Sequence, residues 1–98
     1  MNRVKISGVV LQCGDVRYTP AGIPIVELRI QHESLQIEAD MQRQIKLEAD
    51  AVVIGPLAKM AATVRVDEKV VISGFLAQKS QKNDRLVIHV SELQRTEC

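Results

Sequence analysis

Apolar and polar residues alternate in three separate segments, and this period of two constrains the fold more than any other feature of the chain. The clearest case is a segment in which Val26, Leu28 and Ile30 alternate with polar residues. Such alternation is typical of strands that have one buried and one solvated face. We expect further strands at residues 3–11, 45–54, 68–78 and 85–93.

Proline, glycine and polar clusters separate these segments. Residues 17–24 predict a turn, 33–44 an exposed loop or hairpin tip, and 79–84 a second hairpin tip. Gly55 and Pro56 end the third strand, and residues 57–62 are the only good helical stretch. Glycines inside the first and fourth strands indicate the bends that a barrel needs.

The order strand, strand, strand, helix, strand, strand predicts an all-β protein, a five-stranded OB-fold barrel with one short helix between strands 3 and 4. We expect residues 1–98 to form a single OB-fold domain, because the length suits one small domain and no linker or repeat is visible. A small sandwich or an SH3-like barrel is the structural alternative.

Composition restricts the core and the setting of the protein. The chain has one Tyr, one Phe and no Trp, so the core must be aliphatic. We expect Phe75 to be buried and the Tyr18 ring, which lies in a turn, to be accessible. No apolar run approaches the roughly 20 residues that cross a bilayer, and the first residues lack the apolar region of a secretory signal. Two cysteines make no disulfide framework, which favours a cytoplasmic location.

The sequence contains no motif that carries catalysis. Glycine loops of the phosphate-binding type, nucleophile elbows and paired metal-binding histidines are all absent. His32 and His89 are far apart in the sequence and are expected to be structural, and Cys13 has no neighbouring cation to activate it. We therefore predict a protein that is not an enzyme and that uses no metal or cofactor.

Charge is unevenly distributed although the net charge is only +1, a value that excludes a strongly basic nucleic-acid binder. Residues 33–50 carry five acidic and two basic side chains, whereas residues 79–85 carry three basic side chains against Asp84. A basic hairpin of this kind can neutralise phosphates. A hairpin that is simply solvated explains the same charges equally well.

Several short motifs, in order, resemble a known family. Residues 1–4 and 17–24 resemble the opening of bacterial single-stranded DNA-binding proteins. Gly22-Ile23-Pro24, then His32-Glu33-Ser34, then residues 71–76 and His89 are similar to the family of primosomal replication protein N (PriB), over nearly the whole chain.

The resemblance implies an OB-fold homodimer of the replication-restart primosome. Members bind single-stranded DNA, stimulate the helicase PriA and help to bring in components such as DnaT. Lys46 stands where well-studied members carry an aromatic residue, so it can contact phosphate but cannot stack. The basic positions that match locally, together with Lys46 and the accessible ring, give these expected DNA-binding residues: Arg17, Tyr18, Lys46, Lys79, Lys82 and Arg85.

Two other functions stay open at this point. A general single-stranded DNA-binding protein usually carries a Gly/Pro/Gln-rich linker and an acidic tip, and the sequence ends at Cys98 without them. An OB-fold protein–protein adaptor with weak DNA affinity would fit the few aromatics and the acidic segment. A homodimer also has a physical motive, because an apolar first strand on an open barrel needs its edge covered.

Overall fold

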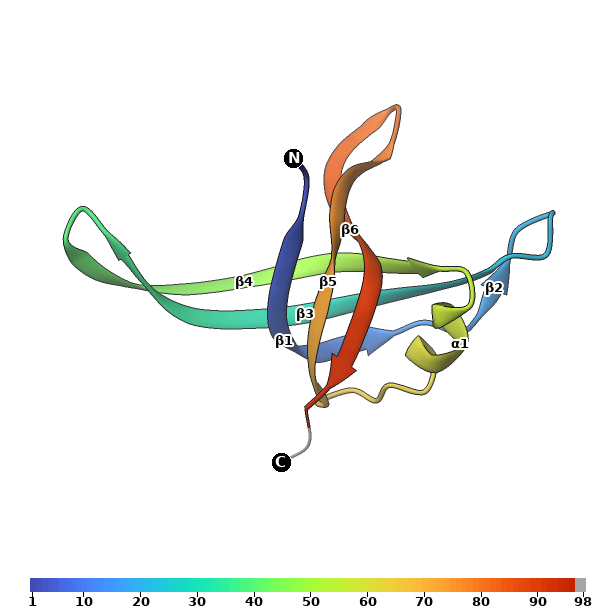
Figure 1. Cartoon of the computed structure of the whole chain (residues 1–98), viewed down its shortest axis with the longest axis horizontal. Helices are drawn as coiled ribbons and strands as arrows, with labels where there is room; N and C mark the ends of the chain where they lie inside the picture. The colour runs from blue at the N-terminus through green and yellow to red at the C-terminus, as the bar shows by residue number, and fades with distance from the viewer. Residues whose placement is uncertain (97–98) are drawn as a thin grey trace.

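The computed structural model describes residues 1–96, which form six strands and one short helix (Figure 1). The elements, in chain order, are β1 (Val4–Cys13), β2 (Arg17–Tyr18), β3 (Pro24–Glu38), β4 (Met41–Ile54), α1 (Leu57–Ala61), β5 (Lys69–Ser80) and β6 (Asn83–Arg95).

The five long strands close into a barrel. The sheet runs β1-β5-β6-β4-β3, and β1 also pairs with β3, which joins the two ends of the sheet. Val9 is the point of closure, since it pairs with Lys69 of β5 and with Gln31 of β3. The two-residue β2 adds to the edge of β3. This is the predicted all-β OB-fold barrel, with α1 between the third and fourth long strands.

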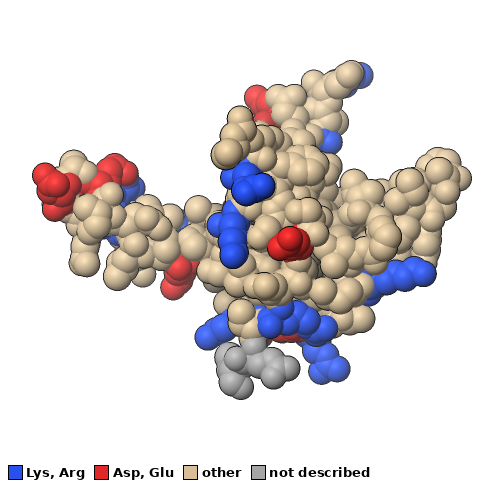
Figure 2. All heavy atoms as spheres, in the orientation of Figure 1, with Lys and Arg blue, Asp and Glu red and all other residues tan. Residues whose placement is uncertain are grey.

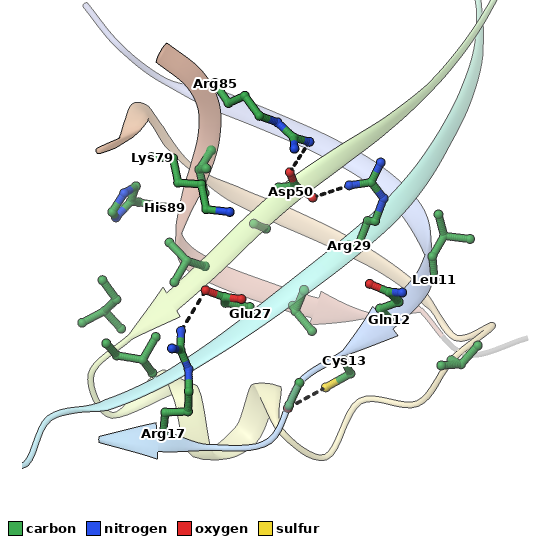
Figure 3. Close-up of a pocket in the computed structure, with 18 residues that line it drawn as sticks. Leu11, Gln12, Cys13, Arg17, Glu27, Arg29, Asp50, Lys79, Arg85 and His89 are labelled. Carbon is green, nitrogen blue, oxygen red and sulfur yellow. Dashed lines mark hydrogen bonds and ion pairs between the residues drawn. The ribbon is translucent and has the colours of Figure 1, made fainter. Parts of the chain in front are cut away.

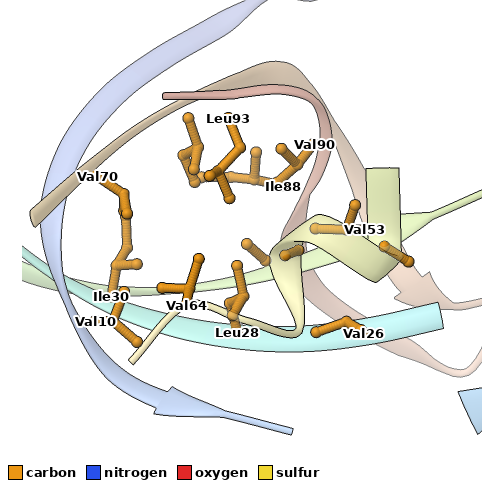
Figure 4. Close-up of a cluster of buried hydrophobic side chains, with 14 residues drawn as sticks. Val10, Val26, Leu28, Ile30, Val53, Val64, Val70, Ile88, Val90 and Leu93 are labelled. Atoms are coloured by element: carbon orange, nitrogen blue, oxygen red, sulfur yellow. The ribbon is translucent and has the colours of Figure 1, made fainter. Parts of the chain in front are cut away.

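The core is aliphatic, as the composition predicts (Figure 4). Side chains from all five long strands meet inside the barrel, among them Val10, Ile30, Val53, Ile72 and Ile88. The helix covers one end with two alanines that are fully buried. The expectation that Phe75 belongs to this core is wrong, because its side chain is 46% exposed.

Two glycines allow strands to approach closely. A Cβ atom on Gly8 would lie 2.8 Å from the carbonyl oxygen of Gln31, close to where β1 leaves β5 for β3. A Cβ atom on Gly74 would lie 1.8 Å from the carbonyl oxygen of His89, at a bulge in the β5–β6 pairing. The bulge of β1 itself falls later, between Val10 and Gln12.

The long β3–β4 hairpin replaces most of the loop expected at residues 33–44. The strands stay paired out to Glu38 and Met41, so only Ala39 and Asp40 form the turn. Both turn residues have positive φ, 52° and 62°, as type I′ hairpin turns require. The interpretation as a hairpin tip is therefore confirmed for two residues, and the loop interpretation of the remainder is wrong.

The other two predicted turns are also shorter than expected. Arg17 and Tyr18 pair with Ile25 and Pro24, which turns the start of the 17–24 segment into β2. The β5–β6 hairpin stays ordered as strand to Ser80 and resumes at Asn83, and residues 81–82 form its tip.

An ion pair ties the end of β6 to the segment before β5. The Arg95 guanidinium donates through Nη2 to Glu68 at 2.9 Å and through Nη1 to the Thr63 hydroxyl at 2.9 Å. The hydrogen bond from Arg95 and a further one from the Arg65 backbone lower the pKa of Glu68 to about 2. The carboxylate therefore stays charged until strongly acidic pH, and the pair holds over the neutral range.

We expect Gly74→Ala to destabilise the fold, because the new methyl group would collide with backbone rather than with a side chain that can move. The free energy of unfolding should fall by about 2–4 kcal/mol in urea denaturation. Gly14→Ala is the matched control, since its Cβ would lie 3.4 Å from the Glu27 carbonyl oxygen, an ordinary contact. Equal stability of the two variants would contradict the close approach at Gly74.

Candidate functional site

An open groove of about 830 Å³ runs over the outer face of β3, β4 and β6 and past the ends of β1 and β2 (Figure 3). On β3 and β4 most of its residues occupy the positions that alternate with the buried core, namely Ile25, Glu27, Arg29, Asp50, Val52 and Ile54. Ile25, Val52, Ile54 and Val87 make part of the lining apolar. The polar lining comes from these side chains: Arg17, Glu27, Arg29, Asp50, Lys79, Arg85 and His89.

Carboxylates in the groove are paired with its arginines. Asp50 accepts from Arg29 at 2.6 Å and from Arg85 at 2.8 Å, one with each carboxylate oxygen (Figure 3). Arg17 donates to Glu27 at 2.8 Å. A hydrogen bond to Glu48 and the charge of Asp50 raise the pKa of Arg29. The groove thus holds more cations than carboxylates, and its arginines are oriented before any ligand arrives.

Lys79 differs from these arginines. It lines the groove, and within residues 1–96 its ammonium group makes no ion pair. Lys82 lies at the tip of the β5–β6 hairpin, outside the residues that line the groove. The structure therefore brings Arg17, Lys79 and Arg85 to one groove, and places Lys82 at the end of the hairpin that borders it.

The other two expected residues lie elsewhere. Tyr18 is 62% exposed on β2, next to Arg17 in the chain but not among the lining residues. Lys46 lies on the outer part of β4 and pairs with Glu33 of β3 at 3.5 Å. Neither residue shares the groove with the basic side chains.

A second exposed ring was missed by sequence reasoning. Phe75 of β5 stacks on His89 of β6, with ring centroids 5.0 Å apart and planes only 10° from parallel. His89 lines the groove, so the pair forms an aromatic surface at its border. Counting in steps of two from buried Val70 and Ile72 places Phe75 on the outer face. In the sequence, the sign of this parity is the polar Ser73, two residues before Phe75.

The outer part of the β3–β4 hairpin, residues 33–46, projects from the barrel and is called the arm below (Figure 1). Leu35, Ile37 and Met41 on the arm are 66–70% exposed. Leu35 and Ile37 share one face of the hairpin, because they are two residues apart on the same strand. The arm therefore exposes three large aliphatic side chains, and two of them lie on one face.

The arm also carries the acidic end of the molecule (Figure 2). Arg43 pairs with Glu38 at 2.9 Å and Lys46 pairs with Glu33, so both basic side chains of the arm are neutralised within it. Asp40 at the turn adds a further negative charge. Phosphates would be repelled from this surface rather than bound.

His32 and Cys13, which could in principle be reactive, lie in surroundings that give them structural roles. His32 contacts the Ser7 carbonyl oxygen at 2.7 Å and the Ser34 hydroxyl at 2.8 Å, on the same strand face as the buried residues before it. Burial, and then the charge of Asp15, raise the pKa of Cys13, which disfavours the reactive thiolate. Among the described residues, no group of three metal-ligating side chains comes together. No helix in that part of the chain is long and apolar enough to cross a membrane.

The side chains of the groove suit the binding of an extended polyanion. Guanidinium and ammonium groups attract phosphates of any sequence, and the apolar floor and the Phe75–His89 stack offer surfaces for flat rings.

Known single-strand binding proteins are similar to this chain in sequence. Residues 2–92 match the sequence model of a family described as "another single-strand binding protein family". The chain is 36% identical over 95 residues to the replication restart protein PriB of Bordetella pertussis, covering 97% of this chain and 89% of the relative. It is 38% identical over 91 residues to the PriB of Nitrosomonas europaea, covering 93% and 84%.

Solved structures extend the similarity to the fold. The PriB of Ralstonia solanacearum superposes with a TM-score of 0.88 at 30% identity and covers 99% of both chains. The single-stranded DNA-binding protein of Thermus aquaticus superposes with a TM-score of 0.81 at 20% identity, over 99% of this chain and 50% of that chain. The chain therefore belongs to the PriB family of replication restart proteins, within the single-strand binding proteins.

Proposed function

We propose that this PriB family member binds single-stranded DNA in the β3–β4–β6 groove without reading its sequence, and that it stimulates the PriA helicase during replication restart. The observation that carries the DNA-binding part is the gathering of Arg17, Lys79 and Arg85 at one groove beside the Phe75–His89 stack. The chain acts in the cytoplasm as an accessory protein and catalyses no reaction itself. Its role in restart includes preparing the site for DnaT.

Attraction between basic side chains and phosphates contributes most to the proposed DNA binding, and stacking of bases on aromatic rings contributes less. Lys79 is free to meet a phosphate, and Lys82 extends the basic edge along the hairpin. Phe75 is exposed enough for a base to stack on it, which would contribute about 1–3 kcal/mol. Lys46 is a weaker candidate because Glu33 already neutralises it. The affinity should be moderate, which suffices where a helicase bound at the same fork raises the local concentration of DNA.

We expect the double substitution Lys79→Ala with Arg85→Ala to weaken binding to oligo-dT roughly tenfold at low salt, because the phosphate contact of Lys79 is lost together with the part of the Arg85 charge that Asp50 leaves available. The slope of log affinity against log salt should become shallower by up to about 1.4, or about 0.7 per contact on a single strand. Fluorescence anisotropy of labelled oligo-dT and oligo-dC measures both quantities.

The matched control is Lys59→Ala, which removes a cation from α1, outside the lining of the groove. It should bind like the wild type. Unchanged affinity of the double variant, or a loss for oligo-dT alone, would argue against a groove that holds the backbone without reading bases.

The arm is the surface that we assign to the helicase. Its exposed Leu35 and Ile37 can enter an apolar site on a partner protein, and its excess negative charge disfavours DNA at the same place. This arrangement also gives the adaptor function specific support, with DNA and helicase meeting different parts of the molecule.

The double substitution Leu35→Ser with Ile37→Ser should reduce stimulation of PriA unwinding on a forked substrate at least tenfold, since the loss of two apolar anchors costs about 2 kcal/mol or more and each ~1.4 kcal/mol is a factor of ten. Affinity for oligo-dT should stay within about twofold of the wild type, because both side chains lie outside the groove. Gln36→Ser, on the opposite face of the same strand, is the control. Stimulation that survives the double substitution would remove the arm from the helicase interface.

We propose a homodimer that pairs through β1. Val4 to Val9 pair with β5 on one side, and no strand within residues 1–96 pairs with the opposite edge of residues 4–6. At Ser7 this edge already meets β3, because the Ser7 carbonyl oxygen contacts His32. A two-fold pairing of two such edges would satisfy the free backbone groups.

Sedimentation equilibrium should give twice the 10.9 kDa mass of the chain at micromolar concentration. The amides of residues 4–6 should exchange hydrogen more slowly as the protein concentration rises. A monomer whose exchange at these amides is independent of concentration would contradict pairing through β1.

A further inference from the structure

Asp50 occupies a special place among the charged residues of the groove. It lies on β4 with its side chain only 26% exposed, and it touches Arg29 of β3 and Arg85 of β6 at once. Each of its two oxygens accepts from a different guanidinium (Figure 3). One half-buried carboxylate is therefore shared by two of the cations that are available to a phosphate.

The other ion pair of the groove is of a different kind. Arg17 and Glu27 have side chains that are 63% and 61% exposed, so water and salt screen their interaction and a phosphate can displace it at little cost. Asp50 is less exposed than either, and its charge acts through a medium that screens less well. Its effect on a bound anion should therefore exceed that of Glu27.

We propose that Asp50 limits the affinity of the groove for single-stranded DNA. Its carboxylate competes with phosphate for N–H groups of Arg29 and Arg85 and repels a phosphate that approaches either of them. The inference rests on the proposed function and refines it. DNA binds, but weakly enough to be released, because a negative charge is built into the centre of the basic surface.

Asp50 also orients both arginines, which favours phosphate binding, whereas its negative charge opposes phosphate binding. Asp50→Asn separates these two effects. Asn keeps one carbonyl oxygen that can accept from an arginine, and it has the shape of Asp, while it removes the charge. Asp50→Asn thus retains part of the positioning and loses all of the repulsion. The net result should be tighter binding, by about three- to tenfold.

The experiment is a titration of labelled oligo-dT with the full chain, as wild type and as Asp50→Asn, over a series of salt concentrations. The variant should bind about three- to tenfold more tightly at 0.1 M salt, a value near which screening acts over about 10 Å. Its affinity should also fall more steeply with salt, by up to about 0.7 in slope for each arginine that becomes free to contact phosphate. A purely structural role of Asp50 would not steepen the salt dependence.

Glu48→Gln is the matched control. Glu48 also accepts from Arg29, at 2.8 Å, but it lies outside the residues that line the groove. It should change the affinity by less than about twofold, because surface ion pairs of this exposure contribute little. If Asp50→Asn is unstable in thermal melting, Asp50→Ser provides the same comparison.

The outcomes separate the two proposals. Wild type that binds oligo-dT while Asp50→Asn binds equally or more weakly overturns the role of Asp50 and leaves DNA binding intact. A wild type that shows no binding even at low salt overturns the DNA-binding function itself. Tighter binding with an unchanged salt slope would also overturn the inference, since no additional arginine would then be meeting phosphate.

Discussion

The pairing of β1 with both β5 and β3 is the constraint on which the rest of the structure depends. It joins the two ends of the sheet at Val9 and forces every long strand to present one face inward and one outward. The inward faces fill with aliphatic side chains. The outward faces of β3, β4 and β6 are then adjacent, and the groove is formed from strands that a single backbone closure holds in position.

Electrostatic balance, rather than positive charge alone, characterises the groove. Its arginines form ion pairs with carboxylates, whereas the Lys79 ammonium group forms no ion pair within residues 1–96. The groove keeps a small positive excess, because its four basic side chains face two carboxylates. A surface of this kind fits the proposed weak binding of single-stranded DNA, because contact with many phosphates at full strength would retain the strand.

Much of the fold was predictable, and the exceptions have physical causes. Alternation at Val26, Leu28 and Ile30 predicts the strand and its inner face, and the structure agrees. The extent of the arm was not predictable, because its turn at Ala39 and Asp40 lacks the glycine or asparagine that usually marks positive φ.

The site was only partly predictable for a related reason. Sequence reasoning found basic residues of the groove one by one, and the local match to a family placed them. It could not find the contact between Asp50 and Arg85, because these residues meet through the pairing of β4 with β6, which are far apart in the chain. Phe75 was misassigned because the general tendency of phenylalanine to be buried outweighed the strand parity that places it outside.

The β4–β6 pairing has one more consequence. It is parallel and involves only Ala51 with Ile88 and Val52 with His89, whereas β3 and β4 pair along their whole length. The barrel therefore has a narrow seam, and the groove lies across it. A ligand that contacts both strands would hold β4 and β6 together across the seam. Because such a ligand binds only the folded barrel, the free energy of unfolding should rise with the fraction of protein that is bound.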